Sequence, residues 1–422
     1  MNMNRRQVLA AIGAVSASTL IPSTTSAAVK PRVLVIGGGF AGSTAAKYIR
    51  KWSSANIDVK LIDPKTSHTS CVMSNLVLNR QLKLSDLKFS HGPLNLNYGV
   101  EVVKDRVVEI DPVGHRVRLR SGGWEQYDKL IIATGIAFKK PKGVNFNLTP
   151  HAWIAGGQTN KLATMVESLG AGSTFVMTIP KAPYRCPPGP YERACLVADH
   201  FKRNGFDSGE SRVIVLDENP WIQAERHTFE KAFSGIYSNI IEYIPNAEIA
   251  AVRSELGVVE TSLGDFAGDV VNPIPRHRAH GFVRKSGLTD SSGWAMVDPV
   301  TYESTAPDGQ DVYIIGDAQN TKQPKSGHMA NSQAKICADA ILRDFTGGSN
   351  YTEERLANIT TNSACYSPIT YDEASWLTAN FAYDQEAGGM ALTHIGEAEN
   401  WNRENFRQMF GWANNLFSDS FL

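Results

Sequence analysis

The sequence of 422 residues has no surplus of either charge, because 42 Lys and Arg residues balance 42 Asp and Glu residues. A dedicated nucleic-acid binder needs an excess of Lys and Arg to displace counterions from phosphates, so this class is excluded. The sequence also lacks an uninterrupted apolar run of the about 20 residues that a membrane-spanning helix needs. We therefore expect neither a nucleic-acid partner nor an integral membrane span.

Cysteine is scarce as well. Five cysteines in a chain of this length are too few for a disulfide scaffold. None of them stands in a Cys-x-x-Cys-His motif, so this chain attaches no c-type haem itself. No pair has the spacing of zinc ligands, and no metal site is predicted. The five cysteines leave room for one or two redox or covalent roles.

The first 28 residues have the layout of an export signal. Arg5 and Arg6 precede a weakly apolar stretch at 8–21, and the small residues at 25–27 offer a cleavage site. No acidic residue occurs before Asp58. This pattern predicts a twin-arginine signal peptide and a periplasmic mature protein. The alternative is a short helix that stays on the protein.

The mature chain opens with a short apolar run followed by a glycine-rich turn. Residues 32–36 are typical of a buried parallel strand. Gly37 permits a tight turn, Gly39 lets a pyrophosphate approach the backbone, and Gly42 lets the following helix pack closely. The N-terminus of that helix, predicted at 43–52, would face the phosphates. The turn therefore predicts a dinucleotide site.

The next strand supports the same interpretation. Residues 57–63 are predicted as the next strand, which ends in Asp63. An acid about 20 residues after the turn can bond a ribose hydroxyl. The alternative is a glycine-rich turn in some other βαβ unit.

Two later strands distinguish FAD from NAD. Residues 127–135 form a buried strand ending in Thr134 and Gly135, and another apolar strand ends in Gly316 and Asp317. With the glycine-rich turn, these segments resemble the flavoproteins with two dinucleotide-binding domains, the glutathione-reductase-like superfamily. In that family an aspartate matching Asp317 bonds the ribityl chain of FAD. The alternative role for Asp317 is to cap the following helix.

Such flavoproteins usually carry a second glycine-rich turn for NAD(P)H. Here the corresponding strand, 173–179, is followed at 180–190 by a segment with one glycine and five prolines. Proline has no amide hydrogen and fixes φ, so this loop cannot form a cradle of N–H groups for phosphate. A helix at 191–202 and a strand at 211–217 indicate that the βαβ fold is kept. We expect that the chain does not use NAD(P)H.

The predicted fold class is therefore α/β, with two Rossmann-like domains of the glutathione-reductase type and a C-terminal interface domain. The predicted boundaries are 1–28 for the signal peptide, 29–143 with 275–353 for a discontinuous FAD-binding domain, 144–274 for a degenerate NAD-type domain, and 354–422 for the interface domain.

Three cysteines lie where they could carry chemistry. A thiolate at Cys71 could attack the 8α-methyl carbon of a flavin, although position alone favours a small buried hydrophobic residue. Cys186 lies in the proline-rich loop before a helix, whose dipole is expected to lower the thiol pKa. Cys365 is predicted in a polar loop. The latter two could form a redox disulfide over a flavin or a structural one; Cys195 and Cys337 are predicted to pack in helices.

The segment 185–194 resembles a signature of the flavoprotein subunit of flavocytochrome c sulfide dehydrogenase. Residues 70–75, 324–333 and 364–367 fit the same family. The resemblance spans 32–422 and is weakest after about residue 370.

This resemblance implies a specific chemistry. The cysteine matching Cys71 carries FAD through an 8α-thioether, and the pair matching Cys186 and Cys365 forms a redox disulfide. The glutamate matching Glu192 acts as an acid or base beside that pair. The implied activity is oxidation of sulfide to sulfur or polysulfide, with electrons passed to a c-type cytochrome subunit that carries the haem in a heterodimer.

Two other functions are considered. A sulfide:quinone oxidoreductase shares the fold but needs an amphipathic membrane anchor, for which 406–417 is the candidate. Arg407 is the only basic residue in that segment, which is poor for a lipid surface. The third function is a non-catalytic flavin electron carrier. The proline-held Cys186 argues against it, because a carrier needs no disulfide.

Overall fold

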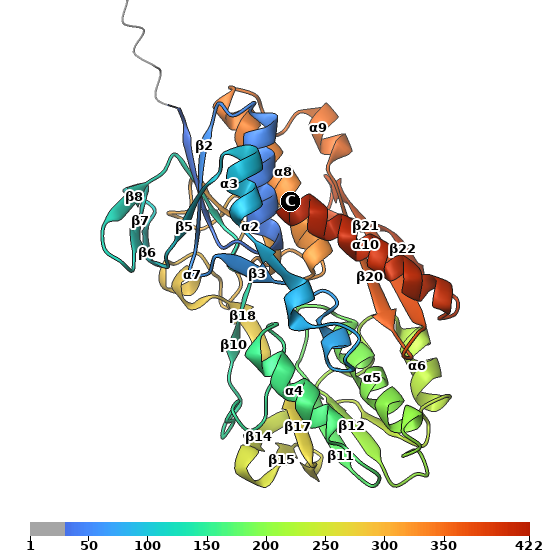
Figure 1. The fold of residues 1–422 in the computed structure, drawn as a ribbon. Coiled ribbons are helices and arrows are strands. Elements are labelled where there is room, and N and C mark those ends of the chain that lie inside the picture. Colours follow the sequence, from blue (N-terminus) through green and yellow to red (C-terminus); the bar gives the residue numbers. More distant parts are fainter. Residues whose placement is uncertain (1–29) are drawn as a thin grey trace, which may run out of the picture. The chain divides into compact units, whose positions relative to one another are not determined.

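The structure, a computed structural model, describes residues 30–422, so the predicted export signal lies outside the described residues (Figure 1). The first sheet is parallel, with strand order β19-β9-β1-β2-β5. Its strands are β1 (Arg32–Ile36), β2 (Asp58–Asp63), β5 (Glu101–Lys104), β9 (Lys129–Ile132) and β19 (Val312–Ile314). The last strand returns from far along the chain to complete this sheet, beside β9.

Two long helices cover this sheet and pack against each other. They are α2 (Phe40–Trp52) and α8 (Gly327–Phe345), which lie side by side in Figure 1. Small residues such as Ala45 and Ala334, both fully buried, allow close packing around these helices. The N-terminus of α2 directly follows the glycine-rich turn, so its unpaired N–H groups open the predicted dinucleotide site.

The second parallel sheet has strand order β13-β12-β11-β17. Its strands are β11 (Thr174–Ile179), β12 (Arg212–Asp217), β13 (Ile241–Ile244) and β17 (Val270–Pro273). The helices of this part are α4 (Gly157–Glu167), α5 (Gly189–Arg203) and α6 (Arg226–Ser234). The predicted α/β fold is confirmed, and central strands of the two parallel sheets, such as β1 and β11, are apolar and largely buried. The domain boundaries remain a prediction, since Pro31–Leu422 forms one compact unit.

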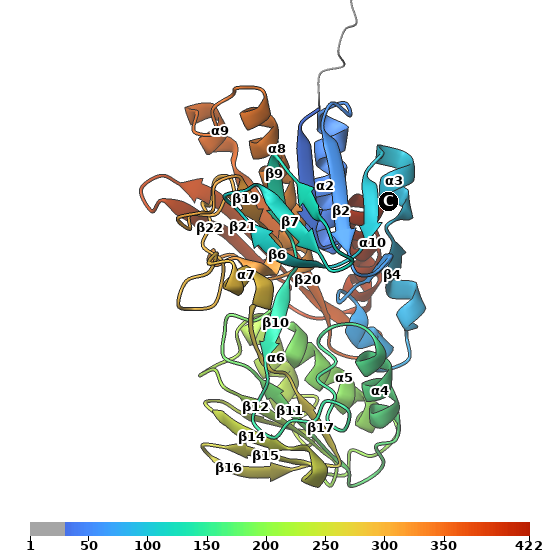
Figure 2. The same ribbon diagram turned by 90° about the vertical axis from the view of Figure 1, so that its left-hand side faces the viewer.

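Smaller elements complete the chain. Antiparallel β14 (Ile249–Arg253), β15 (Val258–Thr261) and β16 (Gly264–Ala267) lie beside β11 (Figure 2). The remaining short elements are β3 (Ser67–Thr69) paired with β4 (Lys88–Ser90), β6 (Val107–Asp111), β7 (Arg116–Leu119) and β8 (Trp124–Gln126) in one meander, β10 (Ile136–Lys139) paired with β18 (Arg276–Ala279), and helices α3 (Gly92–Tyr98), α7 (Gly281–Lys285) and α9 (Glu353–Asn358).

The C-terminal part is an antiparallel sheet with one helix. The sheet contains β20 (Thr360–Pro368), β21 (Ala374–Asp384) and β22 (Gly389–Glu397), and α10 (Arg403–Phe421) packs on β20, β21 and α2. Within residues 30–422, no helix is long and apolar enough to cross a bilayer.

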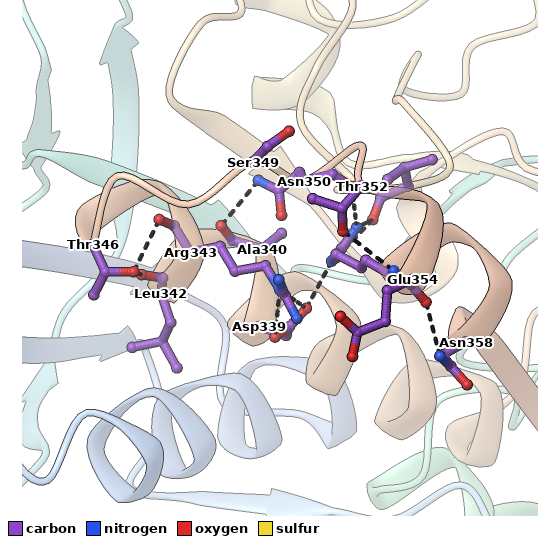
Figure 3. A network of polar contacts seen from close by, with 12 residues as sticks. Asp339, Ala340, Leu342, Arg343, Thr346, Ser349, Asn350, Thr352, Glu354 and Asn358 are labelled. Carbon is purple, nitrogen blue, oxygen red and sulfur yellow. Dashed lines mark hydrogen bonds and ion pairs between the residues drawn. The ribbon is translucent and has the colours of Figure 1, made fainter.

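A polar network fixes the chain where it passes from α8 through α9 into β20 (Figure 3). Asn350 Nδ2 donates to Ala340 O at 3.1 Å, and Arg343 Nε donates to Asp339 at the same distance. The buried Arg355 guanidinium also donates to Asp339 and to two backbone carbonyls, Val300 O and Asn350 O. Helix α9, which leads into β20, is thus anchored to α8.

Candidate active site

A cavity opens at the carboxyl ends of the first sheet, where parallel α/β sheets bind their ligands. Most of the predicted cofactor residues line it, namely Gly37, Gly39, Asp63, Cys71, Thr134, Gly135, Gly316 and Asp317. Segments that are far apart in the sequence therefore meet at one place, as the predicted dinucleotide site requires.

Two glycines of the turn, Gly37 and Gly42, leave no space for side chains. Gly37 has φ +101°, and a Cβ on Gly42 would lie 1.8 Å from Gly37 O. Gly42 therefore does not line the cavity but sets the packing of α2 against the turn. Asp63 Oδ2 accepts a hydrogen bond from Gly38 N at 2.7 Å, which places its carboxylate at the rim of the cavity. Its predicted ribose contact stays a prediction.

The polar atoms of this cavity fit a hydroxyl-rich dinucleotide. Thr134 Oγ1 and Asp317 Oδ1 are buried without a hydrogen-bond partner among residues 30–422. Burial also raises the pKa of Asp317. A buried carboxylate oxygen without a partner is costly, and a ligand hydroxyl would satisfy it. The residues present thus fit FAD, and Asp317 and Thr134 would be its polar contacts.

A second pocket brings together the predicted catalytic residues. Cys186 and Glu192 come from the loop before α5 and its first turn, Cys365 from β20, and Cys71 from the segment after β3. Four residues line both this pocket and the dinucleotide cavity: Cys71, Arg185, Ser326 and Gly327. The cysteine pocket therefore adjoins one end of the predicted cofactor site, with Cys71 at the junction. Cys195 and Cys337 are fully buried in helices, as predicted.

The environment of Cys186 corrects one expectation. Its thiol pKa is raised well above the usual range by burial and by the neighbouring Cys365 and Glu192, whereas the α5 dipole was expected to lower it. A Cβ on Gly189 would lie 2.7 Å from Cys186 Sγ, so the thiol packs closely on the start of α5, where loss of water outweighs the dipole. The backbone of Cys186 has φ +60°, held by a 2.7 Å bond from its N–H to Lys325 O.

Cys365 corrects a second expectation, because it lies within strand β20 rather than in a loop. The polar sequence suggested a loop, but β20 pairs with β21 along its whole length. The serine hydroxyl groups of β20 find hydrogen-bond partners on neighbouring elements. The Ser363 hydroxyl is hydrogen-bonded to that of Ser326 at 2.8 Å, and the Ser367 hydroxyl donates to Glu225. Burial raises the Cys365 pKa to about 12. Cys186 and Cys365 are both free thiols in the structure, and their disulfide remains a prediction.

Glu192 is a buried acid at this pocket. It is 8 % exposed, and burial raises its pKa to about 8, although a hydrogen bond from Asn75 favours the ionised form. Asn75 is held by Arg193 Nε at 3.1 Å and itself donates to Gly189 O at 3.1 Å. A carboxyl with a pKa near neutrality beside two thiols can accept or donate protons.

Several N–H groups of the proline-rich loop after β11 are already hydrogen-bonded to side chains of the protein. Lys181 N and Ala182 N donate to Glu218 and Asn219 at 2.8 and 2.9 Å, and Arg185 N donates to His277 at 2.9 Å. Together with the prolines, these bonds leave little donor capacity for a nucleotide phosphate.

Three residues near these pockets, Lys325, His328 and Glu225, were not identified from the sequence. Lys325 Nζ donates to Gln319 O at 2.6 Å and lies over the Trp294 ring, and burial lowers its pKa to about 8. His328 lines the cysteine pocket, and its Nδ1 accepts from Ala364 N at 2.9 Å. Glu225 precedes α6 and accepts a hydrogen bond from Ser367 of β20. Lys325 and His328 fall within the segment 324–333 that resembles the family, so this resemblance could have identified them. No sequence motif points to Glu225.

No cluster of His, Cys, Asp and Glu side chains that could hold a metal ion occurs in the part of the chain that the structure describes.

Comparison with known proteins agrees with this geometry. Residues 31–160 match the family described as pyridine nucleotide-disulphide oxidoreductase. Residues 159–275 match the central part of the sulfide dehydrogenase (flavocytochrome c) flavoprotein chain. That chain from Chlorobaculum thiosulfatiphilum is 50 % identical over 46 residues, covering 11 % of this chain and 94 % of the relative.

Other relatives carry a different name. The mitochondrial sulfide:quinone oxidoreductase of Dictyostelium discoideum is 22 % identical over 353 residues, covering 79 % of this chain and 76 % of the relative. The solved structure of the sulfide:quinone oxidoreductase of Aquifex aeolicus has a TM-score of 0.76 at 16 % identity, covering 93 % of this chain and 92 % of that one. The chain thus belongs to the FAD-dependent pyridine nucleotide-disulfide oxidoreductase family, with a central part of the flavocytochrome c sulfide dehydrogenase type.

Proposed function

We propose that this chain is the flavoprotein subunit of a sulfide dehydrogenase that oxidises sulfide to sulfur or polysulfide and passes the electrons to a c-type cytochrome. One observation carries the proposal: Cys71, Cys186, Cys365 and Glu192 line one pocket that adjoins the cavity fitting FAD. Each relative named above also has sulfide oxidation in its name.

The reaction begins at a disulfide between Cys186 and Cys365. Hydrosulfide attacks one sulfur, the S–S bond breaks, and the products are a persulfide on one cysteine and a thiolate on the other. When bound, FAD supplies a two-electron acceptor that can release its electrons one at a time. Burial disfavours charged thiolates here, so proton transfer must accompany each step. Glu192 is the residue that we assign to this transfer at Cys186.

Cys71 is assigned a different role from the redox pair. It lies at the junction of the two pockets, where it would hold FAD through a covalent thioether beside the pocket of Cys186 and Cys365. We therefore keep the covalent attachment of FAD at Cys71 as part of the proposal.

The fold of α10 favours cytochrome over quinone as the acceptor. A quinone enzyme was expected to use 406–417 as a membrane anchor. In the structure, Met409, Ala413 and Phe417 of this segment are buried against the body of the protein. An apolar face that is already packed internally is not free to enter a lipid surface. The match at 159–275 also favours the cytochrome-linked enzyme.

A comparison of acceptors tests this function. Steady-state sulfide oxidation is measured with a c-type cytochrome and with a short-chain quinone, using the same FAD-loaded protein. We expect faster turnover with cytochrome. Faster turnover with quinone would assign the chain to the quinone enzymes instead, and no turnover with either would refute sulfide oxidation.

We also propose export to the periplasm by the twin-arginine route. The proposal rests on the layout of residues 5–27 in the sequence. Fractionation and N-terminal sequencing of the mature protein test it, with a start near Ala28 expected. A full-length cytoplasmic protein would contradict it.

A further inference from the structure

Glu225 is a buried acid that has no role in the reaction as proposed above. It is 2 % exposed and directly precedes α6. Its Oε2 accepts a hydrogen bond from Ser367, and its Oε1 has no hydrogen-bond partner among residues 30–422. No cation of the described chain pairs with it; the adjacent Arg226 pairs with Glu230. Such a carboxyl is expensive to bury in its ionised form.

The position of Glu225 connects it to Cys365. Cys365 and Ser367 are two residues apart on β20, so their side chains lie on the same face of the sheet. Ser367 is bonded to Glu225, which brings this acid next to the cysteine. Among the charged groups around Cys365, Glu225 has the largest effect in raising the pKa of its thiol. At Cys186, Cys365 has the largest such effect, and Glu192 is the acid that follows it. Each cysteine of the pair thus has its own buried acid.

A chain of hydroxyl groups continues from Glu225 to a partly exposed carboxylate. Ser375 on β21 lies beside Glu225, and its Oγ is 3.3 Å from Thr228 Oγ1. Thr228 Oγ1 donates to Glu397 Oε1 at 3.1 Å. Ser375 and Thr228 are both buried, and Glu397 ends β22 in a partly exposed position. Hydroxyl groups accept and donate at once, so such a chain can pass a proton.

We propose that Glu225 accepts the proton of Cys365 and releases it to solvent through Ser375, Thr228 and Glu397. The inference rests on the proposed function and completes its proton balance. Oxidation of one H₂S to zero-valent sulfur gives up two electrons, which pass to the acceptor, and two protons. Glu192 takes the first proton when H₂S attacks the Cys186 sulfur as hydrosulfide. The second proton, carried on the persulfide, passes to the buried Cys365 thiolate, and Glu225 takes it when this thiol gives up its electrons. The two acids lie on different elements: Glu192 on α5 and Glu225 at the start of α6.

The groups that face Glu225 agree with this role. Glu192 on α5, Cys365 on β20 and Glu397 on β22 are all acidic and favour a protonated Glu225, whereas the Ser367 and Ser375 hydroxyls favour the ionised form. Burial is the largest influence, and the resulting pKa of about 7 lets Glu225 gain and lose a proton near neutral pH.

The test compares Glu225→Gln and Thr228→Val with Glu230→Gln, a control on the exposed face of α6. Thr228→Val keeps the shape of the side chain but breaks the hydroxyl chain. In the FAD-loaded protein, sulfide turnover and proton release, followed with a pH indicator, are measured together. We expect a loss of about 10-fold or more for Glu225→Gln, a smaller loss with a larger solvent isotope effect for Thr228→Val, and no change for Glu230→Gln. Proton release at the wild-type rate in both Glu225→Gln and Thr228→Val would overturn the proposal.

Infrared difference spectra separate this proposal from the proposed function. Between pH 5.5 and 8.5, the wild type should lose protonated carboxyl bands from both Glu192 and Glu225. The Glu225 band is the part of this loss that is missing in Glu225→Gln and kept in Glu230→Gln. If the band does not depend on Glu225, the proton-carrying role is refuted whatever the substrate. If the band behaves as expected but sulfide is not oxidised, the proposed function fails and with it the assignment of this path to sulfide protons.

Discussion

Burial decides how the titratable side chains of the cysteine pocket behave. It raises the pKa of Cys186 and Cys365 and brings the pKa of Glu192 to about 8. The helix dipole that the sequence suggested for Cys186 is weaker than this loss of hydration. Sequence alone could place Cys186 before a helix, but only the packing around it reveals the sign of its pKa shift.

At Cys71, the account predicts a covalent bond. Acid precipitation of the purified protein should leave the yellow colour in the pellet, and Cys71→Ser should release it to the supernatant. Cys337→Ser, a change at a buried cysteine outside both pockets, serves as the control. Colour in the supernatant of the unchanged protein would contradict the covalent attachment.

At Glu192, the raised pKa predicts a pH-dependent stability. The unfolded chain loses this proton near pH 4.5, whereas the folded protein keeps it up to about pH 8. Between these values the folded state binds more protons, so the free energy of unfolding falls as pH rises. Relative to Glu192→Gln, the wild type should lose on the order of 4 kcal/mol between pH 5 and 8.5. Denaturant titrations measure this, and a constant difference would show that Glu192 ionises normally.

Among the elements, those with strong local signals were predicted well. The strand at 32–36 is β1 without any shift, and the helix at 191–202 lies within α5 (Gly189–Arg203). Their apolar runs, glycines and prolines act locally, so the sequence carries the signal. The strand β20 was missed because its stability comes from pairing with β21, which overrides its polar composition.

The same limit applies to the site. The cysteines, Glu192 and the glycine-rich turn could be found from motifs. Glu225 could not, because its importance depends on Ser367, which is 142 positions away in the sequence. Contacts of this range arise only once the sheets are assembled.

The proline-rich loop between β11 and α5 predicts that nicotinamide cofactors do not reduce this protein. Its prolines lack N–H groups, and several of the remaining N–H groups are bonded within the protein. Anaerobic mixing with NADH or NADPH should leave the flavin absorbance unchanged over many minutes. Rapid bleaching would show that the loop still admits a nicotinamide.

For the whole molecule, the account predicts a stable complex with a separate c-type cytochrome. The flavin collects two electrons per sulfide, and a haem takes them one at a time. The chain is expressed together with a cytochrome subunit of the flavocytochrome c type and purified through a tag on the flavoprotein. We expect the haem Soret band to co-elute with the flavin in gel filtration. A flavoprotein that elutes without haem at micromolar concentration would contradict a bound subunit.

The central claim is that sulfide reduces this flavoprotein through Cys186 and Cys365. The most direct measurement is an anaerobic titration of the FAD-loaded protein with sulfide, followed by flavin absorbance. The unchanged protein should bleach in proportion to added sulfide, whereas Cys186→Ser and Cys365→Ser should keep their FAD and stay oxidised. Cys337→Ser should behave like the unchanged protein. Full bleaching of Cys365→Ser would contradict the disulfide, and an unchanged protein that sulfide does not bleach would contradict the proposed function itself.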